Sequence, residues 1–187
     1  MSRPRLAAFG SSRIAPNDPR YRDLFTLAKA IGAQGWDGIT GGHQGMMAAF
    51  SEGITAGGGS NRGITLARFP TPPDNTLAEE QRAHNFFDRM GAMIEQADAY
   101  IVLPGGLGTL AELAMTWDLL AIRVLEPRPL LLYGEMWTPI VATLSEQLIL
   151  STDHAQHHIT HCRSHAEVLT ALNAASTSSH TADNHHC

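Results

Sequence analysis

The sequence predicts an α/β protein whose doubly wound, mainly parallel sheet is covered by helices on both faces. Short apolar runs, which are typical of buried strands, alternate with longer segments of helical periodicity. Several of these runs end in turns that are rich in glycine or serine. Together these features favour a Rossmann-like architecture. A length of 187 residues with 43% apolar residues suffices for one core, so we expect a single domain over residues 1–174.

The first half of the chain alternates regularly between the two kinds of segment. The apolar run 6–9 ends in Gly-Ser-Ser and predicts the first strand. Apolar residues at i, i+3, i+4 and i+7 predict a helix over 21–34. The short run 38–40 predicts the second strand, and a helix over 46–55 follows before three glycines stop it. Residues 63–69 predict the third strand.

The second half continues the same alternation after a loop at 70–75, where three prolines remove hydrogen-bond donors. Strands are predicted where apolar runs recur, at 99–103, 129–133 and 159–162. Helices are predicted where an apolar stripe recurs, at 77–97, from the following glycine-rich turn to about 124, at 137–150 and at 166–174. Residues 175–187 are small and polar, and we expect a disordered tail there.

Charge and cysteine content exclude several classes of protein. A net charge of -5 and a pI near 6.0 argue against general binding to nucleic acid or to anionic membranes. Two cysteines provide no disulfide framework, and the first residues lack the apolar run of a signal peptide, so we expect a cytoplasmic protein. Of the thirteen basic residues only Lys29 is a lysine, and its place off the apolar stripe of its helix points it toward solvent.

Three turns at the carboxyl ends of the predicted strands have the composition of an anion site. Parallel strands deliver these ends to one edge of the sheet, where glycine permits close approach and helix N-termini attract anions. The convergence predicts a phosphate-bearing ligand. The residues that we expect to bind it are Ser11, Ser12, Gly41, Gly42, Gly45, Gly105, Gly106, Leu107, Gly108 and Thr109.

From the residues alone, these turns are also compatible with two alternatives. A glycine-rich turn after a strand is often only a tight turn. The run from Gly106 to Ala111 also fits the dinucleotide pattern G-x-G-x-x-A, although the nearest acidic residue to the end of the next predicted strand is Glu135, two residues beyond it. A Walker loop and pyridoxal phosphate chemistry both need a lysine, and Lys29 is near neither kind of site.

Glu112 and Arg89 are the candidate catalytic residues. Glu112 lies opposite the apolar stripe of its helix, so we expect it to point out of the core beside the phosphate turn, where a carboxylate can stabilise an oxocarbenium ion or activate water. With Thr109 it also forms a possible capping box. Arg89 lies at the shoulder of the preceding helix's stripe, where a guanidinium can bind phosphate or orient a carboxylate, or can simply be solvated.

The run PGGLGTLAE from Pro104 to Glu112 resembles the PGGxGTxxE hallmark of the Lonely Guy (LOG) family, together with Arg89 upstream and the Gly41-Gly42-x-x-Gly45 turn. The resemblance implies a cytokinin-activating hydrolase that cleaves the N-glycosidic bond of an N6-modified purine nucleoside 5′-monophosphate (AMP-like) to free base and ribose 5-phosphate. It implies a homodimer, and we expect no organic cofactor, metal or nucleic acid as a partner. It also implies catalytic roles for Glu112 and Arg89 and a ligand contact for Thr116.

Two features of the sequence leave alternatives open. Met90 stands where the family usually has a lysine. Met90 and the absence of a family glutamate after the third strand, where this chain has Thr71-Pro72-Pro73, keep a non-catalytic nucleotide or molybdenum-cofactor carrier on the same fold as the second hypothesis. The spacing of His154, His157, His158 and His161 would suit a metal site on a helix, but residues 158–162 read better as a strand, on which that shared face disappears.

Overall fold

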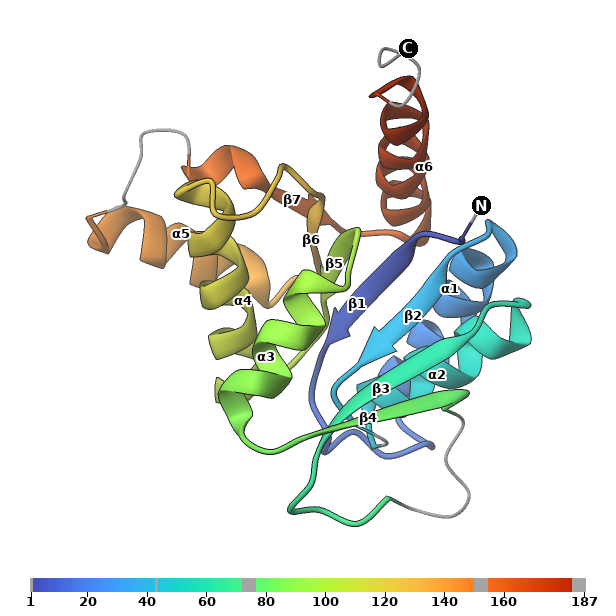
Figure 1. Ribbon diagram of the computed structural model, residues 1–187. Coiled ribbons are helices and arrows are strands. Elements are labelled where there is room, and N and C mark those ends of the chain that lie inside the picture. Colours follow the sequence, from blue (N-terminus) through green and yellow to red (C-terminus); the bar gives the residue numbers. More distant parts are fainter. Residues whose placement is uncertain (1, 43, 72–76, 150–154, 183–187) are drawn as a thin grey trace.

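The computed structural model describes residues 2–42, 44–71, 77–149 and 155–182, and it contains a seven-stranded sheet in which every pairing is parallel (Figure 1). The order across the sheet is β4-β3-β2-β1-β5-β6-β7. The strands are β1 (Arg5–Phe9), β2 (Asp37–Thr40), β3 (Asn61–Leu66), β4 (Glu79–Ala83), β5 (Ala99–Val102), β6 (Leu130–Tyr133) and β7 (Ile159–Cys162). The predicted fold class is confirmed.

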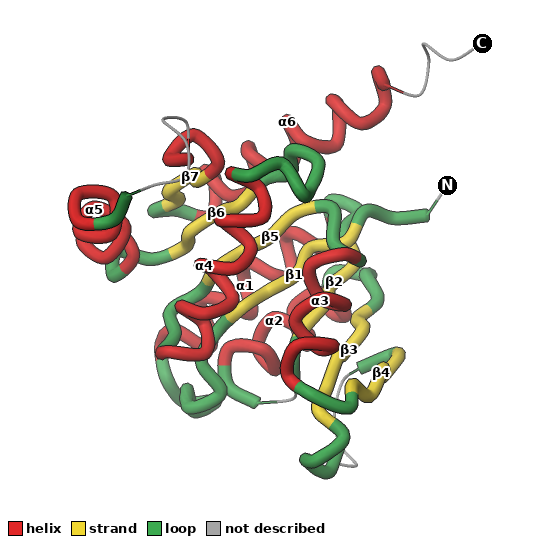
Figure 2. The backbone as a smooth tube through the Cα atoms, turned by 60° about the vertical axis from the view of Figure 1, so that its left-hand side comes forward, coloured by secondary structure: helices red, strands yellow, loops and turns green. Residues whose placement is uncertain are grey.

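Helices cover both faces of this sheet (Figure 2). The helices are α1 (Pro19–Ala33), α2 (Met46–Ala56), α3 (Phe86–Glu95), α4 (Leu107–Ala121), α5 (Trp137–Gln147) and α6 (His165–Ala182), and a 3₁₀ turn η1 (Ala155–His158) precedes β7. Helices α1, α2 and α6 pack on one face, and α3, α4 and α5 pack on the other. Among the described residues no helix is long and apolar enough to cross a membrane.

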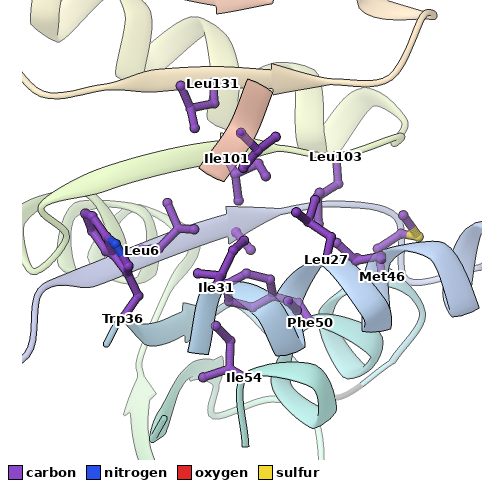
Figure 3. Close-up of a cluster of buried hydrophobic side chains, with 14 of the residues drawn as sticks. Leu6, Leu27, Ile31, Trp36, Met46, Phe50, Ile54, Ile101, Leu103 and Leu131 are labelled. Carbon is purple, nitrogen blue, oxygen red and sulfur yellow. The ribbon is translucent and has the colours of Figure 1, made fainter. Parts of the chain in front are cut away.

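The core consists of two apolar layers that share the strands. In β1 the side chains alternate, so that Leu6 faces the layer of α1 and α2 while Phe9 faces the layer of α3 and α4. Figure 3 shows the first layer, in which Trp36, Phe50 and Ile54 surround the buried strand side chains. Burial on both faces explains why the central strands are continuous apolar runs.

The order of the strands places a topological switch beside β1. From β1 the chain proceeds outward through β2, β3 and β4, and then returns to lay β5 against the other side of β1. The turns after β1 and β5 therefore leave the carboxyl edge of the sheet toward opposite faces, which is the arrangement at which ligands bind in doubly wound folds. The glycine-rich turns predicted from the sequence lie at this edge.

The prediction of one helix over 77–97 is wrong in its first part. Residues 79–83 form β4, which pairs with β3 in the register Arg62↔Glu79 to Leu66↔Ala83. The helix begins only at Phe86, where the side chain of Asn85 accepts a hydrogen bond from the Asp88 N–H at 2.9 Å. Charged residues suit β4 because it is an exposed edge strand, and charge protects such an edge from aggregation.

The last helix is longer than the sequence predicts. It continues from His165 to Ala182 and so passes the expected end at residue 174, while 183–187 lie outside the described residues. The small residues that suggested a disordered tail include good helix formers, and the Ser176 hydroxyl donates to the Leu172 carbonyl one turn earlier at 3.1 Å. Because this segment has few apolar residues, it shows no helical periodicity in the sequence, although its residues still favour a helix.

Candidate active site

The three predicted turns meet at the carboxyl edge of β1, β2 and β5. The Ser11 N–H donates to the Pro104 carbonyl at 3.1 Å, and the Met46 N–H donates to the Ser11 carbonyl at 2.9 Å. Gly45 has a φ of 61° and a Cβ built there would lie 2.2 Å from the Ser11 carbonyl oxygen, so only glycine fits. Backbone hydrogen bonds therefore join turns that are distant in the sequence.

The glycine-rich turn after β5 leads into an uncapped helix N-terminus. The N-cap of α4 is Gly106, and no side chain caps it, so the predicted capping box of Thr109 and Glu112 is wrong. The N-cap lies three residues before the predicted one, and Thr109 instead lies inside the first turn of the helix. Because Leu110 is the first residue that donates to a helical carbonyl, that of Gly106, the earlier N–H groups remain available to an anion.

The glycines of this turn differ in how much space a Cβ atom would have at each position. A Cβ at Gly105 would lie 2.1 Å from the Thr109 hydroxyl oxygen, so packing within the protein explains this glycine. A Cβ at Gly106 or Gly108 would meet no atom within 4 Å, and neither residue has a positive φ. Packing within the protein therefore requires neither of these two glycines. Leu107, also predicted to bind, is 85% exposed between them.

Arg89 and Glu112 form a buried ion pair beside this turn. The Arg89 Nη1 lies 3.4 Å from the Glu112 Oε1, and the two residues are 8% and 6% exposed. The Arg89 Nε also donates to the carbonyls of Gly41 and Ile64, both at 3.1 Å. A Cβ at Gly41 would lie 1.6 Å from the Arg89 Nη2, so a residue with a side chain at position 41 would displace the guanidinium.

The burial of Glu112 differs from the exposure expected from the helical wheel. The wheel places Glu112 opposite the apolar stripe of α4, but the first turn of α3 covers that face with Arg89. The sequence therefore predicted correctly that the Glu112 side chain points away from the apolar core, but it predicted wrongly that this side chain is exposed. A helix interior to a sheet layer has neighbours on more than one side.

Burial dominates the electrostatics of the pair. It raises the pKa of the Glu112 carboxyl from its ordinary value of 4.5 to about 7, and the charge of Arg89 offsets only part of this effect. Burial also lowers the pKa of the Arg89 guanidinium, against the opposing effect of Glu112. A carboxyl with a pKa near 7 exchanges its proton at neutral pH, which is the property of a general acid or base.

Phe86 adjoins the ion pair and Phe87 adjoins Phe86, and no motif in the sequence marks either of them as functional. The Arg89 guanidinium carbon lies 5.9 Å from the centre of the Phe86 ring. Phe87 meets Phe86 edge to face at 6.5 Å. The signal available in the sequence is the position of Phe86, one helical turn before Arg89. Met90, by contrast, is fully buried in the core, so its side chain offers no cation to the site.

The remaining predicted residues lie around this centre. Thr116 is fully buried, and its hydroxyl donates to the main-chain carbonyl of Glu112 at 2.8 Å. The Ser11 hydroxyl accepts from the Arg13 N–H at 3.1 Å, Ser12 is exposed, and Gly42 packs near Met47. Their contacts with a ligand stay predictions.

Cofactor and metal ligands are scarce around the site. Lys29 is exposed on α1, on the other face of the sheet from Arg89. Within the described ranges no three His, Cys, Asp or Glu side chains gather as metal ligands would. His157 and His158 lie in η1 and His161 in β7, rather than on one helix, and His154 lies outside the described residues.

Comparison with solved structures agrees with this fold. The chain is similar to the molybdenum cofactor carrier protein of Chlamydomonas reinhardtii, with a TM-score of 0.70 and 18% identity over 94% of this chain and 99% of that one. It is equally similar to a molybdenum cofactor binding protein of Rippkaea orientalis, with a TM-score of 0.72 and 18% identity over 93% and 98% of the two chains. At this identity the likeness concerns the fold alone.

Sequence comparison points to a particular family. A probable cytokinin riboside 5′-monophosphate phosphoribohydrolase of Oryza sativa subsp. japonica is 37% identical over 113 residues, which are 57% of this chain and 54% of that protein. The cytokinin riboside 5′-monophosphate phosphoribohydrolase of Mycobacterium marinum is 34% identical over 106 residues, 53% and 57% of the two chains. The match thus spans about half the length of these curated relatives.

The family model described as possible lysine decarboxylase matches residues 47–172, which include Arg89, the glycine-rich turn after β5 and Glu112. This range is more than half of the chain, and it spans the elements from α2 to α6. The chain therefore belongs to the possible lysine decarboxylase family, which is the LOG family.

Proposed function

We propose that this protein hydrolyses the N-glycosidic bond of a purine nucleoside 5′-monophosphate with a modified N6 position, releasing the free base and ribose 5-phosphate. The observation that carries the proposal is the buried Arg89–Glu112 pair beside the uncapped N-terminus of α4. The names of the relatives support the same reaction. Schiff-base decarboxylation is disfavoured, because the one lysine, Lys29, is exposed on the opposite face of the sheet.

In the proposed reaction the first-turn N–H groups of α4 bind the 5′-phosphate, since they are the donors that an anion finds at a helix N-terminus. Glycines at 106 and 108 let the phosphate approach the backbone. This anchors the ribose, and Glu112 is one turn further along the same helix. Anchoring by a remote phosphate supplies binding energy that orients the reacting carbon.

Glu112 is proposed to act as the general base. Its carboxylate accepts a proton from water while the water oxygen bonds to C1′ of the ribose and the bond between C1′ and the base nitrogen breaks. The electron pair of that bond leaves with the base, which takes up a proton from solvent. The negative charge of Glu112 also stabilises the oxocarbenium character of the ribose in the transition state. Arg89 is proposed to orient the carboxylate and to assist the reaction as its catalytic partner.

The test is incubation of the purified protein with AMP and with N6-isopentenyladenosine monophosphate, followed by separate assays for free base and ribose 5-phosphate. We expect equimolar release of both products, and a loss of about 10²-fold or more in kcat for Glu112→Gln. Glu95→Gln, at an exposed site on α3, is the matched control and should retain full activity. Absence of base release from every nucleotide would refute the proposed hydrolase activity. Full activity of Glu112→Gln would refute the proposed role of Glu112.

A carrier of a nucleotide or of molybdenum cofactor is the second candidate, since Met90 removes a cation that the family usually has and proteins with carrier names share the fold. A carrier needs no proton-exchanging carboxyl, so the buried Glu112 favours the hydrolase. Stoichiometric binding of AMP without release of adenine would favour the carrier.

We also propose that the protein is a homodimer. Exposed apolar side chains lie on α4 and at its C-cap, Met115 and Ile122 among them, and would be covered by a second copy. Light scattering coupled to gel filtration measures the mass directly. A mass equal to the 20.2 kDa of one chain at micromolar concentration would contradict the proposal.

A further inference from the structure

Phe86 is an aromatic residue whose position the packing of the protein does not explain. It is the first residue of α3, it is 40% exposed, and it belongs to neither of the two apolar layers of the core. One side of its ring faces the guanidinium of Arg89, which is itself buried. A large aromatic side chain left half open beside a buried ion pair suggests a surface for a ligand.

The contacts of Phe86 hold its ring in place. The guanidinium of Arg89 lies 5.9 Å from the ring centre, and Phe87 meets the ring edge to face at 6.5 Å. Arg89 is fixed in turn by the carbonyls of Gly41 and Ile64. The ring is therefore one member of a chain of contacts that leads from solvent through Arg89 to the Glu112 carboxyl.

We propose that Phe86 is the platform on which the base of the substrate stacks, and that it selects purine over pyrimidine nucleotides. The inference rests on the proposed function, because it takes Glu112 as the group nearest the bond that breaks. The base is directly attached to C1′, so a base whose C1′ reaches Glu112 must lie beside the ion pair. Purines offer a larger π-face than pyrimidines, and stacking on an aromatic side chain needs no particular pattern of donors.

The experiment measures binding rather than turnover, in a Glu112→Gln background in which we expect hydrolysis to be slowed about 10²-fold or more. Calorimetric titration gives Kd for AMP, for UMP and for ribose 5-phosphate, which lacks a base. Phe86→Leu keeps an apolar side chain and removes the ring. Phe25→Leu makes the same chemical change on α1, a helix of the opposite face, and is the matched control.

We expect Phe86→Leu to raise the Kd for AMP by about 5- to 150-fold, which is the range that corresponds to the loss of one stacked base. The Kd for ribose 5-phosphate should stay within about twofold, because the phosphate and ribose contacts remain. The preference for AMP over UMP should shrink. Phe86→Trp, which enlarges the π-surface, should preserve or tighten the binding of AMP, and it also serves as the test if Phe86→Leu does not fold.

Equal weakening of AMP and ribose 5-phosphate by Phe86→Leu would overturn the inference, since Phe86 would then act only by holding Arg89. Unchanged binding of AMP, or no binding of AMP by the Glu112→Gln protein, would overturn it as well. If AMP binds in a manner that depends on Phe86 while the unsubstituted protein hydrolyses no nucleotide, the proposed function fails and the stacking site stands. The two failures are thus distinguishable.

Discussion

The raised pKa of Glu112 makes a prediction about stability that needs no substrate. Between the ordinary pKa of 4.5 and the folded value of about 7, the folded protein binds a proton that the unfolded chain has released. Stability therefore falls as pH rises through this window. For these two values the linkage relation gives a loss of about 2.5 kcal/mol between pH 5 and pH 8.

Glu112→Gln isolates this contribution, because glutamine has nearly the same shape and does not titrate. The substitution also changes the partner of Arg89, but Arg89 stays a cation from pH 5 to 8, so that effect is constant with pH. The free energy of unfolding of Glu112→Gln minus that of the unsubstituted protein should thus increase by about 2.5 kcal/mol over this range.

The assay is denaturation by urea at pH 5, 6, 7 and 8, followed by far-UV circular dichroism and by tryptophan fluorescence, with coincident transitions as the check of two-state unfolding. Glu95→Gln, on the exposed surface of α3, should give a difference that does not change with pH. A difference for Glu112→Gln that is flat within about 0.5 kcal/mol, or that changes in the opposite direction, would refute burial as the dominant effect on this carboxyl.

Three further outcomes follow from the geometry around the pair. Arg89→Ala should lower the kcat of base release by about 10²-fold or more, and unchanged kinetics would remove Arg89 from the mechanism. Gly41→Ala should displace the guanidinium and lower activity by about 10²-fold while the circular dichroism spectrum is retained; activity equal to that of the parent would show that the guanidinium tolerates displacement. Gly106→Ala should leave the melting temperature unchanged and weaken AMP binding in titrations. Gly105→Ala should instead cost about 1–3 kcal/mol of stability, because its methyl group would clash with Thr109. The reverse pattern would exclude a ligand at the turn.

The glycines of the site differ in whether contacts within the protein require them. Gly41 and Gly45 are required by contacts within the protein, with Arg89 and with the Ser11 carbonyl. Gly106 and Gly108 face open space, and under the proposed function this space admits the phosphate of the substrate. Composition alone treats all four as turn residues, and only the environment of each Cβ position separates the glycines that internal packing requires from those that it does not.

Much of the fold was predictable because the relevant signals are local. The run at β1 and the stripes of α1 and α2 arise from neighbours within a few residues, and the structure confirms these elements. Strand β4 was not predictable, since its charged residues carry no period and its place depends on pairing with β3. The end of α6 was missed because helical propensity persists where apolar periodicity stops.

The sequence by itself determined the class of the fold, the glycine turns and the identity of Arg89 and Glu112 as candidates, because motif and periodicity are written in adjacent residues. Only the tertiary structure decided that these two residues are buried and paired, since their contact joins positions 23 apart and the contact of Arg89 with Gly41 joins positions 48 apart. Desolvation depends on everything that surrounds a group. The raised pKa of Glu112 is therefore a property of the folded protein that a helical wheel, which describes one helix alone, does not contain.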